Sequence, residues 1–521
     1  MNMKRPLAFA LAFVLALSLW ACGGGDAENS GGPGKSGGTP VEIAKSLGNP
    51  LVGFDGDGNL MYGGDPSALV VGDTLYLYVG HDVAANEAYN IPEYACYSTK
   101  DLQNWTYEGV VLNMKDVTWG TADAAWAGQV ARHYSEADGK DIYYLYFCSW
   151  DKTDSGKQSI GVAVSDSPTG PFTDIGQPIV KGSFTTDHTS DWNDIDPTVW
   201  IETGKDGEEH RYLCWGNGKV YICELNEDMI SVKDYDGDGQ ITFGKDVKSK
   251  TVPSAYTEAP WLYRRQDENG NYYGYYYLFY AHNWREDMCY AILEGDNLMR
   301  DDFYYESRLM EPSATSNTNH MAVVDFLGKT WFIYHNGSLP HGSGFRRVAC
   351  IEELHFDGDG YIDALAETAA GPFGTVSTLT SVKGDLLQHA HFANSYADGD
   401  YPYTNVALGS GLSGATALDG QWVIVQGKAD ANDPYAVSIV SQNKAGLYIT
   451  VSNNGVALAQ DWDGKQAQAQ TFKTVTGLAG QGVSFESLAQ PGMYLTLSGG
   501  AMSLTGGEDA DAASFVIATV E

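Results

Sequence analysis

Three carboxylates that lie far apart in the sequence each stand at the start of a short apolar run. They are Asp65, Asp196 and Glu258, and the first two are each followed by proline and a hydroxyl residue. Hydrolysis of a glycosidic bond needs one carboxyl group to protonate the leaving oxygen and another to act from the opposite face of the sugar. Neighbouring carboxylates also shift each other's pKa, so that one stays protonated while another ionises. These residues therefore predict glycoside hydrolysis if the fold brings them together. The alternative is that they cap turns or face solvent.

The segments that would position these acids form a loose repeat. Between residues 65 and 362, short runs of β-branched and aromatic residues alternate with Gly, Asn and Asp turns and show no helical period. Five units of three or four runs are visible, and their first residues, which are 61, 70, 62 and 62 positions apart, are Asp65, Trp126, Asp196, Glu258 and His320. Units of this length predict an all-β fold, a five-bladed β-propeller. Because the innermost strand of each blade lines the axis, we expect the five first residues to converge at one end of it.

The composition favours a neutral ligand over a nucleic acid. The 521-residue chain has 31 Lys and Arg against 67 Asp and Glu, which gives a net charge of −36. Such a charge repels a phosphate backbone and an anionic lipid surface, so no nucleic-acid partner is expected. Hydrophobic residues make up 43% of the chain and charged residues 19%, which excludes general disorder and supports more than one packed domain. The 33 Tyr and 13 Trp suit a protein that handles sugars.

Short motifs around the three acids resemble those of glycoside hydrolase family 43. The stretches that carry the resemblance are Gly64–Ser67, Asp101–Trp105, Ser165–Phe172, Ile195–Thr198 and Thr257–Trp261. They appear in the expected order within residues 49–362. The resemblance implies an inverting glycoside hydrolase that needs no cofactor for its chemistry. In such enzymes the two carboxyl groups are roughly 6.5–9.5 Å apart, which leaves room for a water molecule.

The resemblance also implies a role for each acid and a class of substrate. Asp65 matches the general base that activates water, Glu258 the general acid, and Asp196 the carboxylate that raises the pKa of the acid and orients it. Further motifs look like those of arabinofuranosidases that act on side chains of arabinoxylan or arabinan. The implied protein is an exo-acting α-L-arabinofuranosidase whose partner is a plant cell-wall polysaccharide or oligosaccharide. The alternatives are a β-xylosidase of the same family and a non-catalytic surface lipoprotein that binds glycans.

Three more residues match family positions around the sugar pocket and the axis. Trp126 matches a tryptophan near the pocket, although Gly128 stands where many members have proline. Arg347 matches a sugar-binding arginine on blade five, with an ambiguity of one residue because Arg346 precedes it. His320 matches an axial histidine that lies near a bound cation or water cluster in many members. The alternative for His320 is a hydrogen-bonded core histidine.

An acidic segment resembles the start of a calcium loop of the EF-hand kind. Asp234, Asp236 and Asp238 occupy positions 1, 3 and 5 of the pattern, and Gly239 occupies position 6. Position 12 is Lys245, where the pattern requires glutamate. We expect a weak structural Ca²⁺ site here or, alternatively, an acidic hairpin on blade three.

The first 21 residues have the features of a bacterial lipoprotein signal peptide. Lys4 and Arg5 precede a 14-residue apolar run that is too short to cross a bilayer as a helix, and Cys22 follows as the predicted lipidation site. Residues 22–45 are rich in glycine and predict a flexible tether. We expect an exported lipoprotein of the cell envelope that meets the membrane only through its lipid. The alternative is an ordinary signal peptide. The other six cysteines lack the close-paired spacing of a zinc site and predict free buried thiols, with disulfides as the alternative in an exported chain.

The composition changes near residue 371, which divides a catalytic domain over residues 46–371 from a C-terminal domain over residues 372–521. Within the second domain, Val437–Ser441 matches Val483–Ser487 after 46 positions, and Phe472 matches Phe515 after 43. Repeats of this length predict a β-trefoil-like fold. A third copy is expected between about 390 and 430. The last copy resembles arabinose-binding trefoil modules, and the alternative is a structural lid on the propeller. The chain is expected to be a monomer.

Overall fold

The computed structural model describes residues 38–154, 156–181, 191–253, 255–283, 287–394 and 402–520. Strands dominate these ranges and are joined by turns and by short 3-10 segments such as η1 (Met114–Asp116) and η3 (Leu418–Gly420). The all-β prediction is therefore confirmed. Among the helices of the described ranges, none has the length and apolar character needed to cross a membrane. The predicted signal peptide, the lipidation site Cys22 and residues 22–37 of the predicted tether lie outside the described residues.

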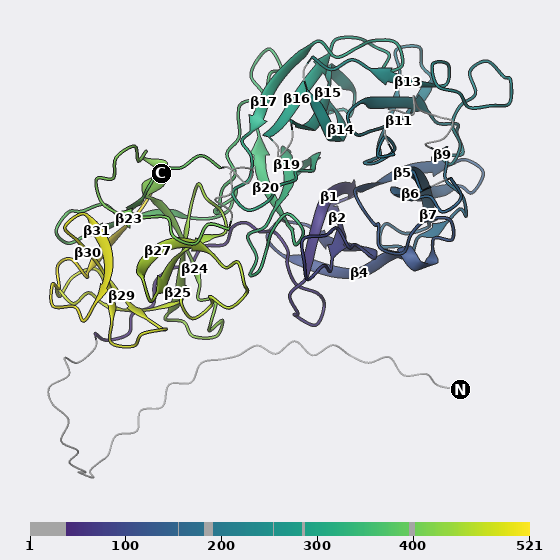
Figure 1. Ribbon diagram of the computed structural model, residues 1–521. Helices are drawn as coiled ribbons and strands as arrows, with labels where there is room; N and C mark the ends of the chain where they lie inside the picture. Colours follow the sequence, from purple (N-terminus) through teal and green to yellow (C-terminus); the bar gives the residue numbers. More distant parts are fainter. Residues whose placement is uncertain are drawn as a thin grey trace, which may run out of the picture. The chain divides into compact units, whose positions relative to one another are not determined.

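Antiparallel sheets follow one another along the chain, and each forms one blade (Figure 1). Blade one contains β1 (Tyr62–Val71), β2 (Thr74–Asp82), β3 (Glu93–Thr99) and β4 (Trp105–Asn113). Blade two contains β5 (Gly128–Ser135), β6 (Lys140–Trp150), β7 (Gln158–Ser165), β8 (Thr173–Asp174) and β9 (Val180–Lys181), of which β8 and β9 both pair with β7. Blade three contains β10 (Thr198–Thr203), β11 (Glu209–Trp215), β12 (Val220–Glu224) and β13 (Val247–Lys250).

The last two blades complete the propeller. Blade four contains β14 (Tyr256–Gln266), β15 (Tyr272–His282), β16 (Asp287–Leu293) and β17 (Tyr305–Met310). Blade five contains β18 (Met321–Phe326), β19 (Lys329–Asn336) and β20 (Val348–Leu354). Residues before β1 also reach this blade, because Leu51 N donates a hydrogen bond to Ala349 O in β20 at 2.9 Å. The start and the end of the propeller are thereby tied together.

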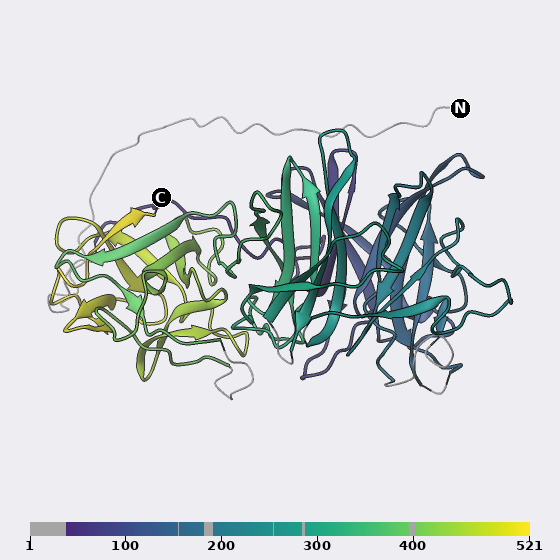
Figure 2. The same ribbon diagram turned by 90° about the horizontal axis from the view of Figure 1, so that it is seen from above.

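The first strand of every blade is the innermost one. Contacts join β1 to β5, β5 to β10, β10 to β14, β14 to β18 and β18 back to β1, so these five strands close a ring. Figure 1 views the blades nearly along the axis of this ring, and Figure 2 views them from the side. The predicted five-bladed β-propeller is therefore confirmed.

Alternation of side chains along the strands explains why the blades pack face to face. In β6, Tyr144 and Tyr146 belong to a core cluster shared with blade three. Tyr143 and Phe147, which alternate with them, belong to a cluster shared with blade one. Successive strand residues point to opposite faces of a sheet, so a sheet that is covered on both faces needs an almost unbroken apolar run. The run over residues 142–148 meets this requirement.

The described part of the C-terminal domain, residues 372–394 and 402–520, contains twelve strands in three units of four. The first unit contains β21 (Val376–Ser381), β22 (Gln388–His389), β23 (Leu408–Gly409) and β24 (Gln421–Gln426). The second contains β25 (Ala436–Ser441), β26 (Leu447–Ser452), β27 (Gly455–Gln460) and β28 (Phe472–Thr476). The third contains β29 (Val483–Ser487), β30 (Tyr494–Ser498), β31 (Ala501–Thr505) and β32 (Phe515–Thr519). This arrangement confirms the β-trefoil-like fold.

The first trefoil unit begins earlier than the sequence suggests. It starts at Val376, whereas the missing copy was expected between about 390 and 430. Its second and third strands are only two residues long and are separated by residues 390–407, which hides the repeat. Its closing aromatic residue is Trp422, which is buried in the same core cluster as Phe472 and Phe515.

Residues 38–46 run along the C-terminal domain. Val41 N donates to Thr474 O at 3.0 Å, and Ser46 N donates to Ile424 O at 2.7 Å. These bonds fix a segment that the sequence predicts as the end of a flexible tether. Its backbone groups find partners on β28 and β24, so residues 38–45 are part of the folded domain rather than a free linker.

The six cysteines of the described residues are free and buried, as the sequence predicts; they are Cys96, Cys148, Cys214, Cys223, Cys289 and Cys350. Burial raises the pKa of each thiol. The thiols therefore stay protonated and pack as small apolar side chains.

Candidate active site

The three predicted acids lie at the same end of the ring of inner strands. Asp65 is in β1, Asp196 lies two residues before β10, and Glu258 is the third residue of β14. A direct contact joins blades three and four, because Asp196 Oδ2 accepts a hydrogen bond from Ala259 N at 2.9 Å. The charge of Asp65 also raises the pKa of both other acids. The three carboxyl groups therefore form one electrostatic cluster.

Unusual backbone conformations position these carboxylates. Asp65, Asp196 and Ala259 have φ values of 50°, 58° and 60°, in the left-handed region that non-glycine residues rarely adopt. The pairing of β1 with β2 and of β14 with β15 is also irregular at these points. Such strain persists only where the surrounding structure enforces it, and it collects at functional sites. Its recurrence at three blade starts supports a functional site here.

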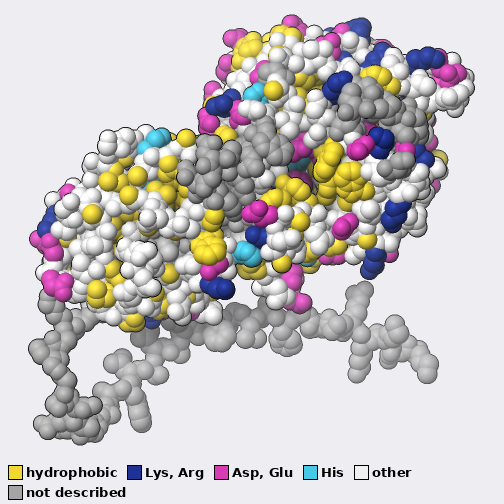
Figure 3. Space-filling view, in the orientation of Figure 1, with side chains coloured by type: hydrophobic (Ala, Val, Ile, Leu, Met, Phe, Trp, Pro, Cys, Tyr) yellow, Lys and Arg dark blue, Asp and Glu magenta, His cyan; other side chains and the backbone are white. Residues whose placement is uncertain are grey.

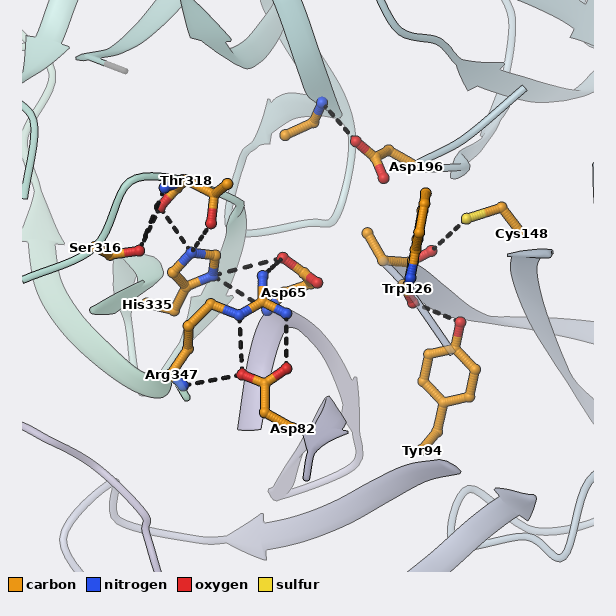
Figure 4. Close-up of polar contacts among 12 residues, drawn as sticks. Asp65, Asp82, Tyr94, Trp126, Cys148, Asp196, Ser316, Thr318, His335 and Arg347 are labelled. Carbon is orange, nitrogen blue, oxygen red and sulfur yellow. Dashed lines mark hydrogen bonds and ion pairs between the residues drawn. The ribbon is translucent and has the colours of Figure 1, made fainter. Parts of the chain in front are cut away.

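A buried cation holds Asp65. Arg347 Nη1 donates to Asp65 Oδ1 at 2.6 Å, while Arg347 Nε and Nη2 each donate to one oxygen of Asp82 at 3.0 Å (Figure 4). Burial raises the pKa of Asp65, but the charge and hydrogen bond of Arg347, together with the effects of His335 and His320, outweigh burial, so that the pKa lies below its ordinary value. Asp65 is therefore ionised at neutral pH, as a general base needs to be.

Glu258 and Asp196 behave in the opposite way. Burial, together with the charge of Asp65, raises the pKa of Glu258 to about 7. A hydrogen bond of 2.8 Å from Asn217 Nδ2 to Glu258 Oε2 partly offsets this rise. Burial and the charges of Glu258 and Asp65 raise the pKa of Asp196 as well. Because these two carboxyl groups interact electrostatically and titrate together, the pair retains a proton near neutral pH and supplies an acid in the same cluster as the ionised Asp65.

Two residues that sequence reasoning missed, Asp82 and His335, complete the surroundings of Asp65. Asp65 N donates to His335 Nδ1 at 3.1 Å, and His335 Nε2 donates to Thr318 O at 2.8 Å. These contacts fix the tautomer of the ring, and burial lowers the pKa of His335 to about 3, so the ring is neutral. The sequence signal for Asp82 is its position at the end of the strand that pairs with β1. His335 lies inside an apolar strand and gives no such signal.

The structure distinguishes the two adjacent arginines of blade five. Arg347 contacts the predicted base Asp65. Arg346 instead donates to backbone oxygens, including His341 O at 2.6 Å. Of the two, Arg347 is the arginine that faces the acid cluster, at the position assigned from the sequence.

Trp126 belongs to a group of aromatic rings. It stacks on Trp192 with 5.1 Å between ring centroids and meets the edge of Trp150 at 5.9 Å. Trp192 is 43% exposed, so the group offers an apolar face of the kind that sugar rings stack on. A Cβ atom at Gly128 would lie 2.7 Å from Tyr146 O, which explains why the chain has glycine there. Figure 3 shows a hollow in which acidic and histidine side chains lie beside hydrophobic ones, and Figure 4 shows Trp126 on the side of the site where Asp196 lies.

His320 lies one residue before β18, at the same end of the axis, and is buried. Burial lowers its pKa to about 4, so the ring is neutral at neutral pH. The groups of potential metal ligands found among the described residues do not include His320. The charge of Arg347 acts on His320 and disfavours a second cation beside it. An axial cation at His320 therefore stays a prediction.

The predicted calcium loop contains a positively charged side chain, that of Lys245. Lys245 forms ion pairs with both Asp236 and Asp238. Ligand oxygens of Asp234, Asp236 and Asp246 lie within 4.8 Å of one another, so the third carboxylate of the group is Asp246 rather than Asp238. The ammonium group lies where the pattern needs a carboxylate, and the loop in this form fits a calcium ion poorly.

Replacing Lys245 with glutamate should convert this loop into a stronger calcium site. The substitution removes the competing ammonium group and supplies the carboxylate that position 12 of the pattern requires. We expect the wild type to bind Ca²⁺ no tighter than about 10⁻³ M and the Lys245→Glu variant to bind more tightly. Isothermal titration with calcium measures both affinities, with Lys248→Glu as a control of equal charge change. Equal affinities in the two variants would contradict this prediction.

Comparisons with known proteins agree with the two-domain architecture. Residues 61–362 match the model described as glycosyl hydrolases family 43, and residues 387–516 match the α-L-arabinofuranosidase B (ABFB) domain. The chain is 31% identical over 345 residues to a xylosidase/arabinosidase of Bacteroides ovatus, covering 58% of this chain and 94% of that protein. It is 30% identical over 347 residues to xylosidase/arabinosidase 43A of Humicola insolens, covering 58% and 96%.

A third relative aligns with more of the chain. An arabinoxylan arabinofuranohydrolase of Paenibacillus polymyxa is 25% identical over 466 residues, covering 82% of this chain and 66% of that protein. Asp65, Asp196 and Glu258 all lie within the first matched model, which spans more than half of the chain. The chain therefore belongs to glycosyl hydrolases family 43.

Proposed function

We propose that this inverting glycoside hydrolase of xylan or arabinan is an exo-acting α-L-arabinofuranosidase that removes side chains from arabinoxylan or arabinan. The observation that supports this narrower activity is the presence, in one chain, of a family 43 propeller and a domain of the α-L-arabinofuranosidase B kind. The relative that aligns over 82% of the chain is named arabinoxylan arabinofuranohydrolase. A neutral pentose side chain also suits a strongly acidic protein, because no phosphate or other anion has to be bound.

In this proposal Asp65 is the general base. Its ionised carboxylate takes a proton from a water molecule, and the oxygen of that water attacks the anomeric carbon of the terminal sugar. Arg347 keeps Asp65 ionised and fixes one of its oxygens, while His335 holds its backbone N–H. The new C–O bond forms on the face opposite the bond that breaks, so the released sugar has the inverted configuration.

Glu258 is the general acid in the same step. It gives its proton to the glycosidic oxygen as the bond to the anomeric carbon breaks, and a pKa of about 7 keeps it largely protonated in mildly acid solution. Asp196 orients it, because the hydrogen bond from Ala259 N fixes the backbone next to Glu258. After one turnover Asp65 carries a proton and Glu258 a charge, and exchange with solvent restores the starting state.

A β-xylosidase is the second candidate, because two relatives are named xylosidase/arabinosidase. The deciding experiment compares kcat/KM on 4-nitrophenyl α-L-arabinofuranoside and 4-nitrophenyl β-D-xylopyranoside and identifies the sugar released from arabinoxylan. Our proposal expects arabinose as the main monosaccharide and the higher kcat/KM on the arabinofuranoside. Release of xylose, with the higher kcat/KM on the xyloside, would establish the second candidate instead.

The proposal includes export and a lipid anchor at Cys22, supported by the basic, apolar and cysteine pattern of the first 22 residues. Metabolic labelling with a radioactive fatty acid should label the wild type and leave Cys22→Ser unlabelled. The wild type should sediment with membranes, and the variant should be released. The buried Cys96 provides the control, because Cys96→Ser should still be labelled. Equal labelling of wild type and Cys22→Ser would refute the anchor.

A further inference from the structure

A glutamine of the C-terminal domain reaches into the propeller. Gln460 is the last residue of β27 and is almost fully buried. Its Nε2 donates hydrogen bonds to Gly337 O at 3.3 Å and to Gly342 O at 3.0 Å. Both acceptors belong to residues 337–347, the loop that joins β19 to β20 in blade five. One amide group therefore ties together two points of this loop that are five residues apart.

The same region of the C-terminal domain contacts the loop at two further points. His341 N donates to Asp461 O at 2.6 Å, directly beside Gln460. A Cβ atom at Gly446 would lie 2.7 Å from Ser338 Cα, so the two backbones are in close contact. His341 has a φ of 59°, a strained conformation that persists only where neighbouring groups enforce it. The bond to Asp461 is one of the contacts that enforce it.

This loop leads directly to the arginine that holds the predicted base. Arg346 Nε donates to His341 O at 2.6 Å, so the middle of the loop is bonded to its end. The next residue is Arg347, whose Nη1 donates to Asp65 Oδ1 at 2.6 Å. A continuous series of short contacts thus runs from Gln460 through the loop to Asp65.

We propose that Gln460 is a positioning residue for the glycosidase reaction, and that the C-terminal domain thereby completes the active site of the propeller. This inference rests on the proposed function, because it requires Asp65 to be the base. This role of the C-terminal domain differs from the two that the sequence suggests, which are glycan binding and a structural lid on the propeller. Activity on a small soluble substrate, which needs no separate binding module, then depends on a residue of the other domain.

The chemistry of the side chain agrees with this role. An uncharged amide offers two N–H donors on one nitrogen, which matches two carbonyl oxygens that need donors in a buried place. Removing it takes this donor away from both carbonyl groups and breaks the link between these two points of the loop. Asparagine keeps the amide but is shorter by one methylene group, so it cannot reach both oxygens in the same backbone position.

The test uses the full-length protein and the variants Gln460→Ala, Gln460→Asn and Gln426→Ala. Gln426 is the matched control, because its Nε2 donates to the backbone oxygens of Asp430, Asp433 and Ala436, all inside the C-terminal domain. Kcat and KM are measured on whichever of the two 4-nitrophenyl glycosides the wild type hydrolyses, together with Tm. We expect both Gln460 variants to lose about 10- to 100-fold in kcat, because small misplacements of reacting groups are costly, and Gln426→Ala to keep wild-type kcat at a similar Tm.

The pH profile provides a readout that a purely structural role would not change. Asp65 has to be deprotonated to act, and a poorly held Arg347 stabilises that charge less, so the acid limb of kcat/KM should move to higher pH. The other titratable or charged groups that interact with Asp65 include His335, His320, Asp82, Asp196, Glu258, Tyr89, Tyr94 and Cys148, and none of them is altered. Gln426→Ala should leave the acid limb unchanged.

Two results would overturn the inference. One is wild-type kcat and an unchanged acid limb in a folded Gln460 variant. The other is an equal loss of kcat in the Gln460 and Gln426 variants that follows Tm. If Gln460→Ala does not fold, Gln460→Asn decides between these outcomes. Failure of the wild type to hydrolyse either glycoside would instead refute the proposed function, and it is visible before any variant is made.

Discussion

Replacing Asp65 with asparagine is expected to lower kcat/KM by about 10²–10⁴-fold, the usual contribution of a general base. Asparagine keeps the shape of the side chain but cannot accept a proton from water. It also tolerates the left-handed φ of 50° at this position, where alanine would add strain. Its Oδ1 still accepts the hydrogen bond from Arg347, and Asp82 still pairs with that guanidinium. The measurement is kcat/KM on a 4-nitrophenyl glycoside, with Tm as the test of folding.

A matched control for this variant exists at the far end of an inner strand. Asp325 lies in β18, five residues beyond His320, and accepts hydrogen bonds from Tyr263 OH at 2.9 Å and from Thr330 Oγ1 at 2.6 Å. Asp325→Asn removes one charge from an inner strand without touching the acid cluster, so kcat/KM should stay near the wild-type value. Near-wild-type kcat/KM in Asp65→Asn would show that another group activates the water.

The sequence predicts the propeller well because each blade is formed by consecutive strands, and the same pattern of strands recurs at nearly equal spacing along the chain. Each blade opens with its inner strand, so equal spacing of strand starts is enough to place Asp65, Asp196 and Glu258 at one end of the axis. The same holds for the last two trefoil units, where Phe472 and Phe515 recur at regular spacing. The first trefoil unit was placed too late, because its two-residue strands leave no pattern of alternating side chains.

The partners of the acids cannot be predicted in the same way, since they depend on strand pairing and on tertiary contacts. Asp82 and Arg347 are 265 positions apart, and only the packing of blade one against blade five brings them together. His335 is a histidine inside an apolar strand, and its role depends on which ring nitrogen faces Asp65 N. Gln460 lies in a different domain from the loop that it holds.

Replacing Glu258 with glutamine should affect substrates according to their leaving group. With arabinoxylan, whose leaving oxygen is a poor leaving group unless it is protonated, kcat should fall by about 10²–10⁴-fold. With a 2,4-dinitrophenyl glycoside the loss should be much smaller, because that leaving group departs as an anion. Glutamine can still accept the hydrogen bond from Asn217 Nδ2, so the fold should be unchanged. Steady-state kinetics on the two substrates measure the difference.

The pH dependence of the same variant identifies the acid. In the wild type, kcat/KM should fall above about pH 7, where the pair of Glu258 and Asp196 loses its proton, and at low pH, where Asp65 becomes protonated. Glu258→Gln has no proton to lose at this position, so with the dinitrophenyl substrate the fall in kcat/KM above pH 7 should disappear while the fall at low pH persists.

The control is Glu353→Gln, which removes a charge paired with Lys329 on blade five. This variant should keep the fall in kcat/KM both above pH 7 and at low pH. A fall near pH 7 that persists in Glu258→Gln would mean that the proton comes from another group, because no carboxyl group remains at residue 258 to supply it.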